Sequence, residues 1–136
     1  MSFETRLQVR FADVDPAGIV FYPRYFEMLN AVVEDWFAQG VGVDFATLHQ
    51  QRRLGVPTVR LECDFLSPGF LGDELTGSVK PTRLGRSSCD VAYLLTGGGV
   101  DRLKAAGVLV CMDLDARKAV PWPDDIRERL EAALAG

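Results

Sequence analysis

Residues 15–37 read DPAGIVFYPRYFEMLNAVVEDWF, and the helix predicted inside this stretch decides the fold. From about Tyr22 to Gln39 the apolar residues recur with a helical period, with Pro23 in the first turn and Gly40 just past the end. On a helical wheel the apolar residues fill about half of the circumference. They are Tyr22, Tyr25, Phe26, Met28, Leu29, Val32, Val33, Trp36 and Phe37. So wide an apolar arc predicts a helix around which a curved sheet wraps.

Strand-like segments lie on both sides of this helix. Residues 3–11 alternate apolar and polar side chains, as in a half-buried strand. Further strands are predicted near residues 56–66, 73–82, 86–96 and 101–114, separated by SPGFLGD, TRLG and TGGGVD at hairpin spacing, which favours an antiparallel meander. A short helix near residues 44–53 and a terminal helix over residues 123–135 complete the order. One long helix among sequential strands predicts the α+β class.

Composition excludes several classes of protein. The 136 residues suit a single domain over residues 1–136, and the formal net charge of −4 argues against nucleic-acid binding. The longest apolar run, GVLVCM, is too short to span a membrane, and MSFETRLQ does not resemble an export signal. Cys63, Cys89 and Cys111 are interpreted as buried free thiols of a cytoplasmic protein. The single histidine, His49, disfavours a histidine metal site, and we interpret it as a surface helix residue.

Two carboxylates, Asp13 and Asp15, lie in the turn between the first strand and the helix. A helix start offers free N–H groups and a positive dipole end, which stabilise an oxyanion. A carboxylate beside it can attack a thioester or ester carbonyl, or activate water. Alternatively, both aspartates only cap the turn and the helix. An aspartyl phosphatase would need a doubly wound parallel sheet, and a calcium loop would need further oxygen ligands, so both are disfavoured.

The stretch DPAGIVFYPRYFEMLNAVVEDWF resembles the active-site segment of the 4-hydroxybenzoyl-CoA thioesterase family of hotdog-fold proteins. GVPTVRLECDF, SPGFLGDEL and a basic turn follow in the family's order, so the resemblance extends to about Asp115. It implies a curved antiparallel sheet of about five strands wrapped around one long central helix. It further implies that Asp15 is the nucleophile or general base, that the Tyr22 N–H is the oxyanion donor, and that Gly18 permits close approach of the loop. Asp13 is then structural.

The resemblance also implies where the acyl group binds. Asn30 matches a family position at which an Asp accepts a ring hydroxyl. Because Asn30 is neutral, the match does not establish that the substrate carries a para-hydroxyl. Alternatively, Asn30 is simply a polar residue at the edge of the apolar arc. Phe21, Tyr25 and Phe26 are expected to line an aryl pocket, although helical spacing equally fits the core. The predicted substrate is therefore an aromatic acyl-CoA, such as a benzoyl or hydroxybenzoyl thioester, with a short aliphatic acyl-CoA as the alternative.

The basic turn KPTRLGR matches the family's coenzyme A phosphate-binding stretch, which assigns this role to Lys80, Arg83, Arg86 and Ser87. A solvated hairpin is the other interpretation. Coenzyme A is part of the substrate, and no metal or other cofactor is expected. The resemblance implies a dimer with a continuous sheet, or a tetramer of two dimers, with sites at the interface. A hydratase is disfavoured because no His lies near Asp15, and a non-catalytic acyl-CoA-binding module would not need the acid there.

Overall fold

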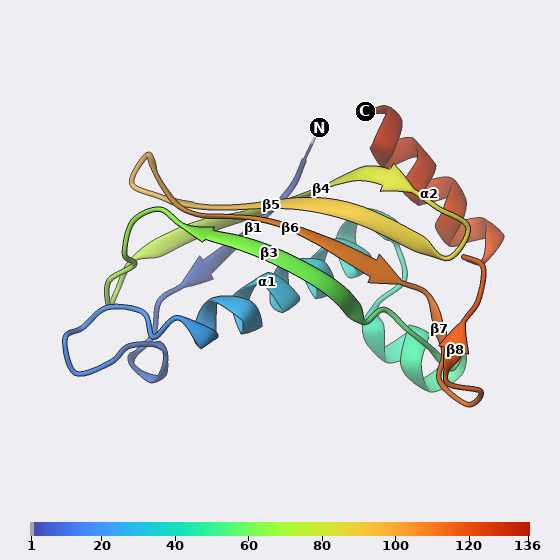
Figure 1. Cartoon of the computed structure of the whole chain (residues 1–136), viewed down its shortest axis with the longest axis horizontal. Coiled ribbons are helices and arrows are strands. Elements are labelled where there is room, and N and C mark those ends of the chain that lie inside the picture. The colour runs from blue at the N-terminus through green and yellow to red at the C-terminus, as the bar shows by residue number, and fades with distance from the viewer. Residues whose placement is uncertain (1) are drawn as a thin grey trace.

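The fold is built on one five-stranded antiparallel sheet, and the computed structural model describes residues 2–136. The sheet has the order β1-β4-β5-β6-β3 and curves around one long helix, α1 (Pro23–Trp36), on its concave side (Figure 1). The strands are β1 (Phe3–Gln8), β3 (Thr58–Phe65), β4 (Glu74–Leu84), β5 (Ser88–Gly97) and β6 (Val100–Val110). The α+β class and the curved sheet around a central helix are thus confirmed.

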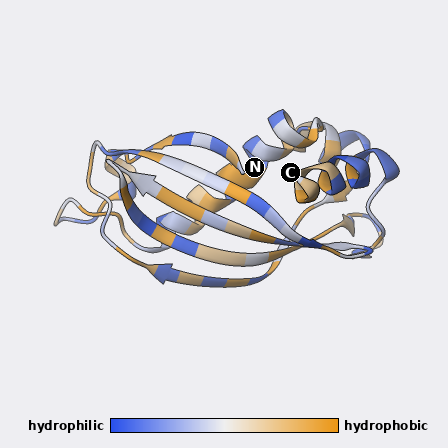
Figure 2. Cartoon of the chain, turned by 90° about the horizontal axis from the view of Figure 1, so that it is seen from above, coloured by the Kyte–Doolittle hydropathy of each residue, from blue (hydrophilic) through white to orange (hydrophobic). Residues whose placement is uncertain are grey.

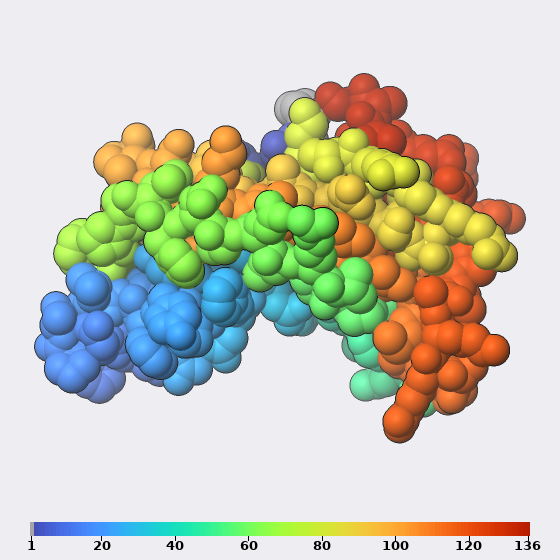
Figure 3. Space-filling model, viewed as in Figure 1, coloured from blue at the N-terminus to red at the C-terminus, as the bar shows by residue number. Residues whose placement is uncertain are grey.

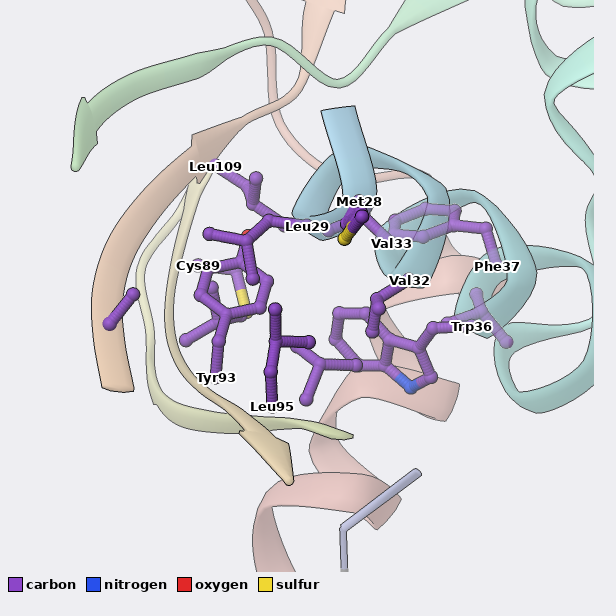
Figure 4. Packing of buried hydrophobic residues seen from close by; sticks show 14 of the residues in the cluster. Met28, Leu29, Val32, Val33, Trp36, Phe37, Cys89, Tyr93, Leu95 and Leu109 are labelled. Carbon is purple, nitrogen blue, oxygen red and sulfur yellow. The ribbon is translucent and has the colours of Figure 1, made fainter. Parts of the chain in front are cut away.

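The helix packs on the sheet through the apolar arc predicted from its sequence. Six of its side chains are buried: Tyr25, Met28, Leu29, Val32, Val33 and Trp36. They pack against inward-facing residues such as Tyr93, Leu95 and Leu109 (Figure 4). At Gly77 on β4 an added Cβ would lie 2.6 Å from Val32 Cγ2, so glycine permits this close approach of helix and sheet.

Side chains of the strands alternate between the core and the outer face of the sheet. Alternating hydrophobic and hydrophilic bands run along the strands in Figure 2, as period-two patterning requires. Cys89 on β5 and Cys111, just past the end of β6, are buried, and burial raises the pKa of these thiols to about 12 and about 11. Cys63, on the edge strand β3, is only partly buried. All three cysteines are free thiols in the structure.

The strand order corrects the predicted meander. β4, β5 and β6 are sequential neighbours, but β3 pairs with β6 at one edge of the sheet while β4 pairs with β1 at the other. Residues 66–73 therefore cross the end of the sheet instead of closing a hairpin. This crossover is held against the helix start, because the Gly69 N–H donates to the Tyr25 hydroxyl at 3.0 Å and Phe70 forms a β-bridge with Ile19.

The ends of two predicted elements also differ. β1 stops at Gln8, and residues 11–13 form a 3₁₀ turn rather than the end of the strand. Helical structure continues past Trp36 through a wide π-turn, Phe37–Val41, and ends at Gly42 (φ 90°) rather than at Gly40. The extra residue of the wide turn keeps both Phe37 and Val41 in the core.

Smaller elements surround the far end of the sheet. A short helical segment that includes Thr47–Gln51 is followed by a three-stranded sheet of β2 (Leu54–Gly55), β7 (Met112–Asp113) and β8 (Lys118–Ala119). The terminal helix α2 (Asp124–Ala135) lies close to β4 and buries Ile126 and Leu130. Within residues 2–136, the structure contains no helix with both the length and the apolar character needed to cross a membrane.

Candidate active site

A tight loop carries Asp15 between β1 and α1. An antiparallel bridge between Val14 and Val20 closes it, and the Asp15 N–H donates to the Ile19 carbonyl at 2.9 Å. Gly18 turns the corner with φ +79°, a left-handed conformation that costs other residues roughly 1–2 kcal/mol. The loop is thus held by main-chain hydrogen bonds, which keeps Asp15 in one position.

The two carboxylates of the loop make different contacts. Asp13 Oδ2 accepts a hydrogen bond from the Arg10 N–H at 2.8 Å, and its carbonyl accepts one from the Phe21 N–H at 2.9 Å. Asp13 therefore holds the loop, as expected. Asp15 Oδ1 accepts one bond, from the Ala17 N–H at 2.9 Å, and Asp15 is partly exposed. Its second oxygen makes no hydrogen bond within residues 2–136.

The helix start presents one free main-chain donor. Pro23 has no N–H, the Arg24 and Tyr25 N–H groups donate to the carbonyls of residues 21 and 22, and the Phe21 N–H donates to Asp13. Among the described residues this leaves the Tyr22 N–H without an acceptor at the positive end of the helix dipole. Such a donor suits an oxygen on which negative charge develops.

An apolar pocket of about 300 Å³ includes Tyr22 in its wall, whereas Asp15 is not one of its lining residues. Its walls are Val20, Tyr22, Tyr25, Phe65, Leu66, Ser67 and Pro68, from the helix start, the end of β3 and the crossover. The Tyr22 and Phe65 rings meet edge to face with centroids 6.2 Å apart. Tyr25 lines the pocket while its hydroxyl is engaged by Gly69, and burial is the main cause that raises its pKa.

The other two predicted aromatic residues lie next to the pocket without lining it. Phe21 packs edge-on against Tyr22, with centroids 5.6 Å apart, and Phe26 lies 6.5 Å from both Tyr22 and Phe65. Both are exposed. The structure therefore gathers an aromatic cluster at the helix start, larger than the set of residues that touches the pocket.

Asn30 lies in a different pocket, with a residue that the sequence interpretation set aside. This second pocket, of about 330 Å³, is lined by Asn30, Phe45, His49, Gly55, Val56, Pro57, Met112 and Leu114. His49 is partly buried, donates through Nδ1 to the Phe45 carbonyl at 2.9 Å and packs against the Phe45 ring. The prediction of a surface helix residue was thus incomplete. Nothing local to LHQQRR signals this position, because the pocket is closed by β2 and β7.

The basic turn lies far from Asp15 within one chain. The loop of Asp15 contacts the crossover, which leads into the start of β4. Arg83 lies at the other end of that strand, and Arg86 and Ser87 lie in the turn that follows it. The eleven residues of β4 span roughly 33 Å at 3.3 Å per residue. Lys80, Arg83 and Arg86 are exposed, and the Arg86 carbonyl accepts a bond from the Trp122 N–H. A single subunit does not bring the predicted coenzyme A residues to the predicted catalytic residue.

Comparisons with known proteins define the family. The Thioesterase-like superfamily model matches residues 9–130. A 1,4-dihydroxy-2-naphthoyl-CoA hydrolase from Thermosynechococcus vestitus is 34% identical over 126 residues, covering 92% of this chain and 86% of that protein. A thioesterase-superfamily structure from Jannaschia sp. CCS1 is 28% identical with a TM-score of 0.90, covering 98% and 93%. A thioesterase from Thermus thermophilus, solved with coenzyme A and Zn, is 32% identical with a TM-score of 0.79, covering 98% and 94%. The chain belongs to the thioesterase-like superfamily and is a hotdog-fold thioester hydrolase.

Proposed function

We propose that the protein hydrolyses an aromatic acyl-CoA to the free acid and coenzyme A. The observation that carries this proposal is the free N–H of Tyr22 at the start of α1, a residue that also lines an aromatic-walled pocket and directly follows the loop of Asp15. The relative from Thermosynechococcus vestitus is named for a bicyclic aromatic acyl-CoA, which supports an aromatic substrate here. The thiolate of coenzyme A is a good leaving group, so one carboxylate and one oxyanion donor suffice.

In the proposed reaction the thioester oxygen accepts a hydrogen bond from the Tyr22 N–H. Asp15 then either attacks the carbonyl carbon, forming an acyl-aspartyl anhydride and expelling the thiolate, or removes a proton from water that attacks the same carbon. In the first route water cleaves the anhydride and regenerates the carboxylate. In both routes the C–S bond breaks, water supplies the new oxygen, and coenzyme A takes up a proton. A burst of coenzyme A release ahead of the free acid distinguishes the anhydride route.

We further propose that a second copy of the chain pairs along β3. This strand forms an edge of the sheet over Thr58–Phe65, and its Val59 and Phe65 side chains are 60% and 52% exposed. An exposed edge strand carries unpaired main-chain N–H and C=O groups, which promote association with another strand. Antiparallel pairing of two β3 strands about a two-fold axis continues the sheet across both subunits. The face below β3 is hollowed between the N-terminal loop and the β7–β8 hairpin, which leaves room for a partner (Figure 3).

Pairing along β3 also relates the basic turn to the active site. In an antiparallel pair of full overlap, the Phe65 end of one β3 lies beside the Thr58 end of its partner. The basic turn of the partner lies at the Thr58 end of its sheet. It therefore lies on the same side of the dimer as Asp15 of the first subunit. We propose that Lys80, Arg83, Arg86 and Ser87 of one subunit bind the coenzyme A phosphates of a substrate held by the other subunit. The free thiols fit a cytoplasmic enzyme.

The experiment that tests the proposed function is hydrolysis of a panel of thioesters by the wild-type protein. The panel contains benzoyl-CoA, hydroxybenzoyl-CoA, 1,4-dihydroxy-2-naphthoyl-CoA, phenylacetyl-CoA and acetyl-CoA. We expect the highest kcat/KM for an aromatic member. The highest value for the aliphatic thioester would overturn the aromatic assignment, and tight binding of every thioester without turnover would identify a binding module. Sedimentation or light scattering tests the dimer: a monomer at assay concentration would overturn the paired β3 edges.

A further inference from the structure

The second pocket contains a hydrogen-bond acceptor that the proposed reaction does not use. His49 Nδ1 lies 2.9 Å from the Phe45 carbonyl, and a carbonyl can only accept, so Nδ1 carries the hydrogen. In the neutral imidazole the other nitrogen, Nε2, is then an acceptor. Packing against the Phe45 ring, with centroids 5.3 Å apart, holds the imidazole in this orientation.

Nε2 lies beside Gly55, another residue of the pocket wall. An added Cβ at Gly55 would lie 3.7 Å from His49 Nε2, and Gly55 itself lines the pocket. Within residues 2–136, Nε2 makes no hydrogen bond. Apart from His49, Asn30 supplies the polar side chain of this pocket, and the remaining walls are apolar or aromatic. A largely apolar pocket with two polar side chains in its wall suits an aromatic ring that bears a hydroxyl.

The position of this pocket decides which subunit it serves. Asn30 lies eight residues beyond Tyr22 on α1, roughly 12 Å along the axis at 1.5 Å per residue. An aromatic acyl group whose carbonyl oxygen is bound by the Tyr22 N–H is too short to reach the second pocket of the same subunit. Pro57 and Val56 of this pocket directly precede β3, whereas Phe65 of the first pocket ends it. Antiparallel pairing of the two β3 strands therefore brings the second pocket of one subunit beside the first pocket of the other.

We infer that His49 of one subunit accepts a hydrogen bond from a ring hydroxyl of the aromatic acyl group whose thioester lies at Asp15 and Tyr22 of the neighbouring subunit. His49 is then a specificity-determining residue that distinguishes hydroxylated aroyl thioesters from unsubstituted ones. This inference rests on the proposed function and on the paired β3 edges. A site built to bind a hydroxyl discriminates against the analogue without one, because its polar group then loses that hydrogen-bond partner.

Two substitutions at His49 form a matched pair. The His49→Asn amide reaches the Nδ1 position, where it can still donate to the Phe45 carbonyl, but it has no atom at Nε2. The longer His49→Gln side chain carries its amide at the Nε2 position and can still accept. We expect His49→Asn to lower kcat/KM for a hydroxyaroyl-CoA by about tenfold, the equivalent of one hydrogen bond, and to leave that for benzoyl-CoA within about twofold. His49→Gln should retain most of the activity towards the hydroxylated substrate.

Equal losses on both substrates, or equal damage by the two substitutions, would overturn the role of His49. If the wild-type protein hydrolysed neither thioester, the proposed function would fail. The inference would then be tested by calorimetric binding of hydroxybenzoate and benzoate. His49→Asn should weaken binding of the hydroxylated acid alone, and an unchanged ratio of the two affinities would contradict the inference.

The assignment to the neighbouring subunit has its own test. Chains carrying His49→Asn and chains carrying Asp15→Asn are unfolded together, mixed in equal amounts and refolded. Random pairing yields mixed dimers in which one of the two sites combines an intact Asp15 with an intact His49 from the other chain, so about a quarter of the wild-type activity towards the hydroxyaroyl-CoA should return. If both residues belonged to one subunit, no site would contain both, and no such recovery would occur.

Discussion

Arg102 and Asp73 form an ion pair of 2.7 Å beside the crossover that supports the loop of Asp15, with side chains only 11% and 27% exposed. Arg102 also donates to the carbonyls of Pro68 and Gly97, at 2.9 and 3.0 Å, and so joins the crossover to the turn between β5 and β6. The crossover in turn holds the loop of Asp15, because the Leu71 N–H donates to the Gly18 carbonyl and the Val20 N–H to the Gly69 carbonyl.

Arg102→Met should therefore reduce both stability and activity. It leaves the partly buried Asp73 carboxylate without its cation, for which a loss of about 3 kcal/mol in the free energy of unfolding is expected. Urea unfolding measures this loss, and kcat measured where the variant remains folded reports the position of the loop. The matched control is Arg6→Met, which removes the exposed Arg6–Glu74 pair and should cost less than about 1 kcal/mol. Similar costs for the two variants would contradict the bracing role.

The pH dependence of stability should contain a contribution from Asp73. A hydrogen bond from the Phe70 N–H, followed by the Arg102 guanidinium, lowers the pKa of this carboxyl below its ordinary value of 3.8. Its stabilising contribution is therefore present above the ordinary carboxyl range and is lost as the pH falls through the lowered pKa. Tm measured between about pH 3 and pH 7 should fall less steeply at the acid end for Asp73→Asn than for the wild type. If the Tm curves of the wild type and of Asp73→Asn ran parallel over this pH range, Asp73 would make no such contribution to stability.

Tyr25→Phe tests the contact between helix and crossover. It removes the hydroxyl that accepts the Gly69 N–H, and Gly69 is buried, so the unpaired donor should cost about 1–3 kcal/mol. Tyr22→Phe removes a hydroxyl from a residue that is 59% exposed and should change the free energy of unfolding by less than about 0.5 kcal/mol. Denaturant unfolding of both variants measures the difference. If Tyr25→Phe left the free energy of unfolding unchanged, the crossover would be held by other contacts.

Arg86→Ala tests the proposed coenzyme A site. Loss of a charge-assisted bond to a phosphate should raise KM for a full coenzyme A thioester by about tenfold, while KM for the matching pantetheine thioester, which lacks the nucleotide, stays near the wild-type value. Steady-state kinetics with both substrates gives the comparison. Arg6→Ala, on another exposed arginine, is the control and should alter neither KM. An equal rise for both substrates would leave Arg86 with a structural role alone.

Local sequence patterns predicted the parts of this fold that depend on periodicity. The apolar arc of α1 and the alternation of β1 follow from which side chains face the core, so they are visible in the sequence. The position of β3 at the sheet edge is not visible there. It depends on pairing with β6, about forty residues later, and on the contact of Gly69 with Tyr25 across 44 residues.

The candidate site divides in the same way. Asp15, Gly18 and Tyr22 lie within one short stretch, so the strand–turn–helix pattern indicates their relation. His49 and Asn30 share a pocket only because β2 and β7 close it, and that closure depends on side chains distant in the sequence. The basic turn was predicted as a group of charges, but its separation from Asp15 depends on the direction of β4, which the turn itself does not reveal.

The central claim is that Asp15 acts on the thioester while Asp13 only holds the loop. Turnover of the best aromatic acyl-CoA is the direct measurement, with wild type, Asp15→Asn and Asp13→Asn compared under conditions where all three are folded. We predict that Asp15→Asn lowers kcat by at least about 10²-fold, the effect of losing a catalytic acid or base, while Asp13→Asn stays within about tenfold of the wild type. Equal turnover by Asp15→Asn and wild type would contradict the proposed mechanism.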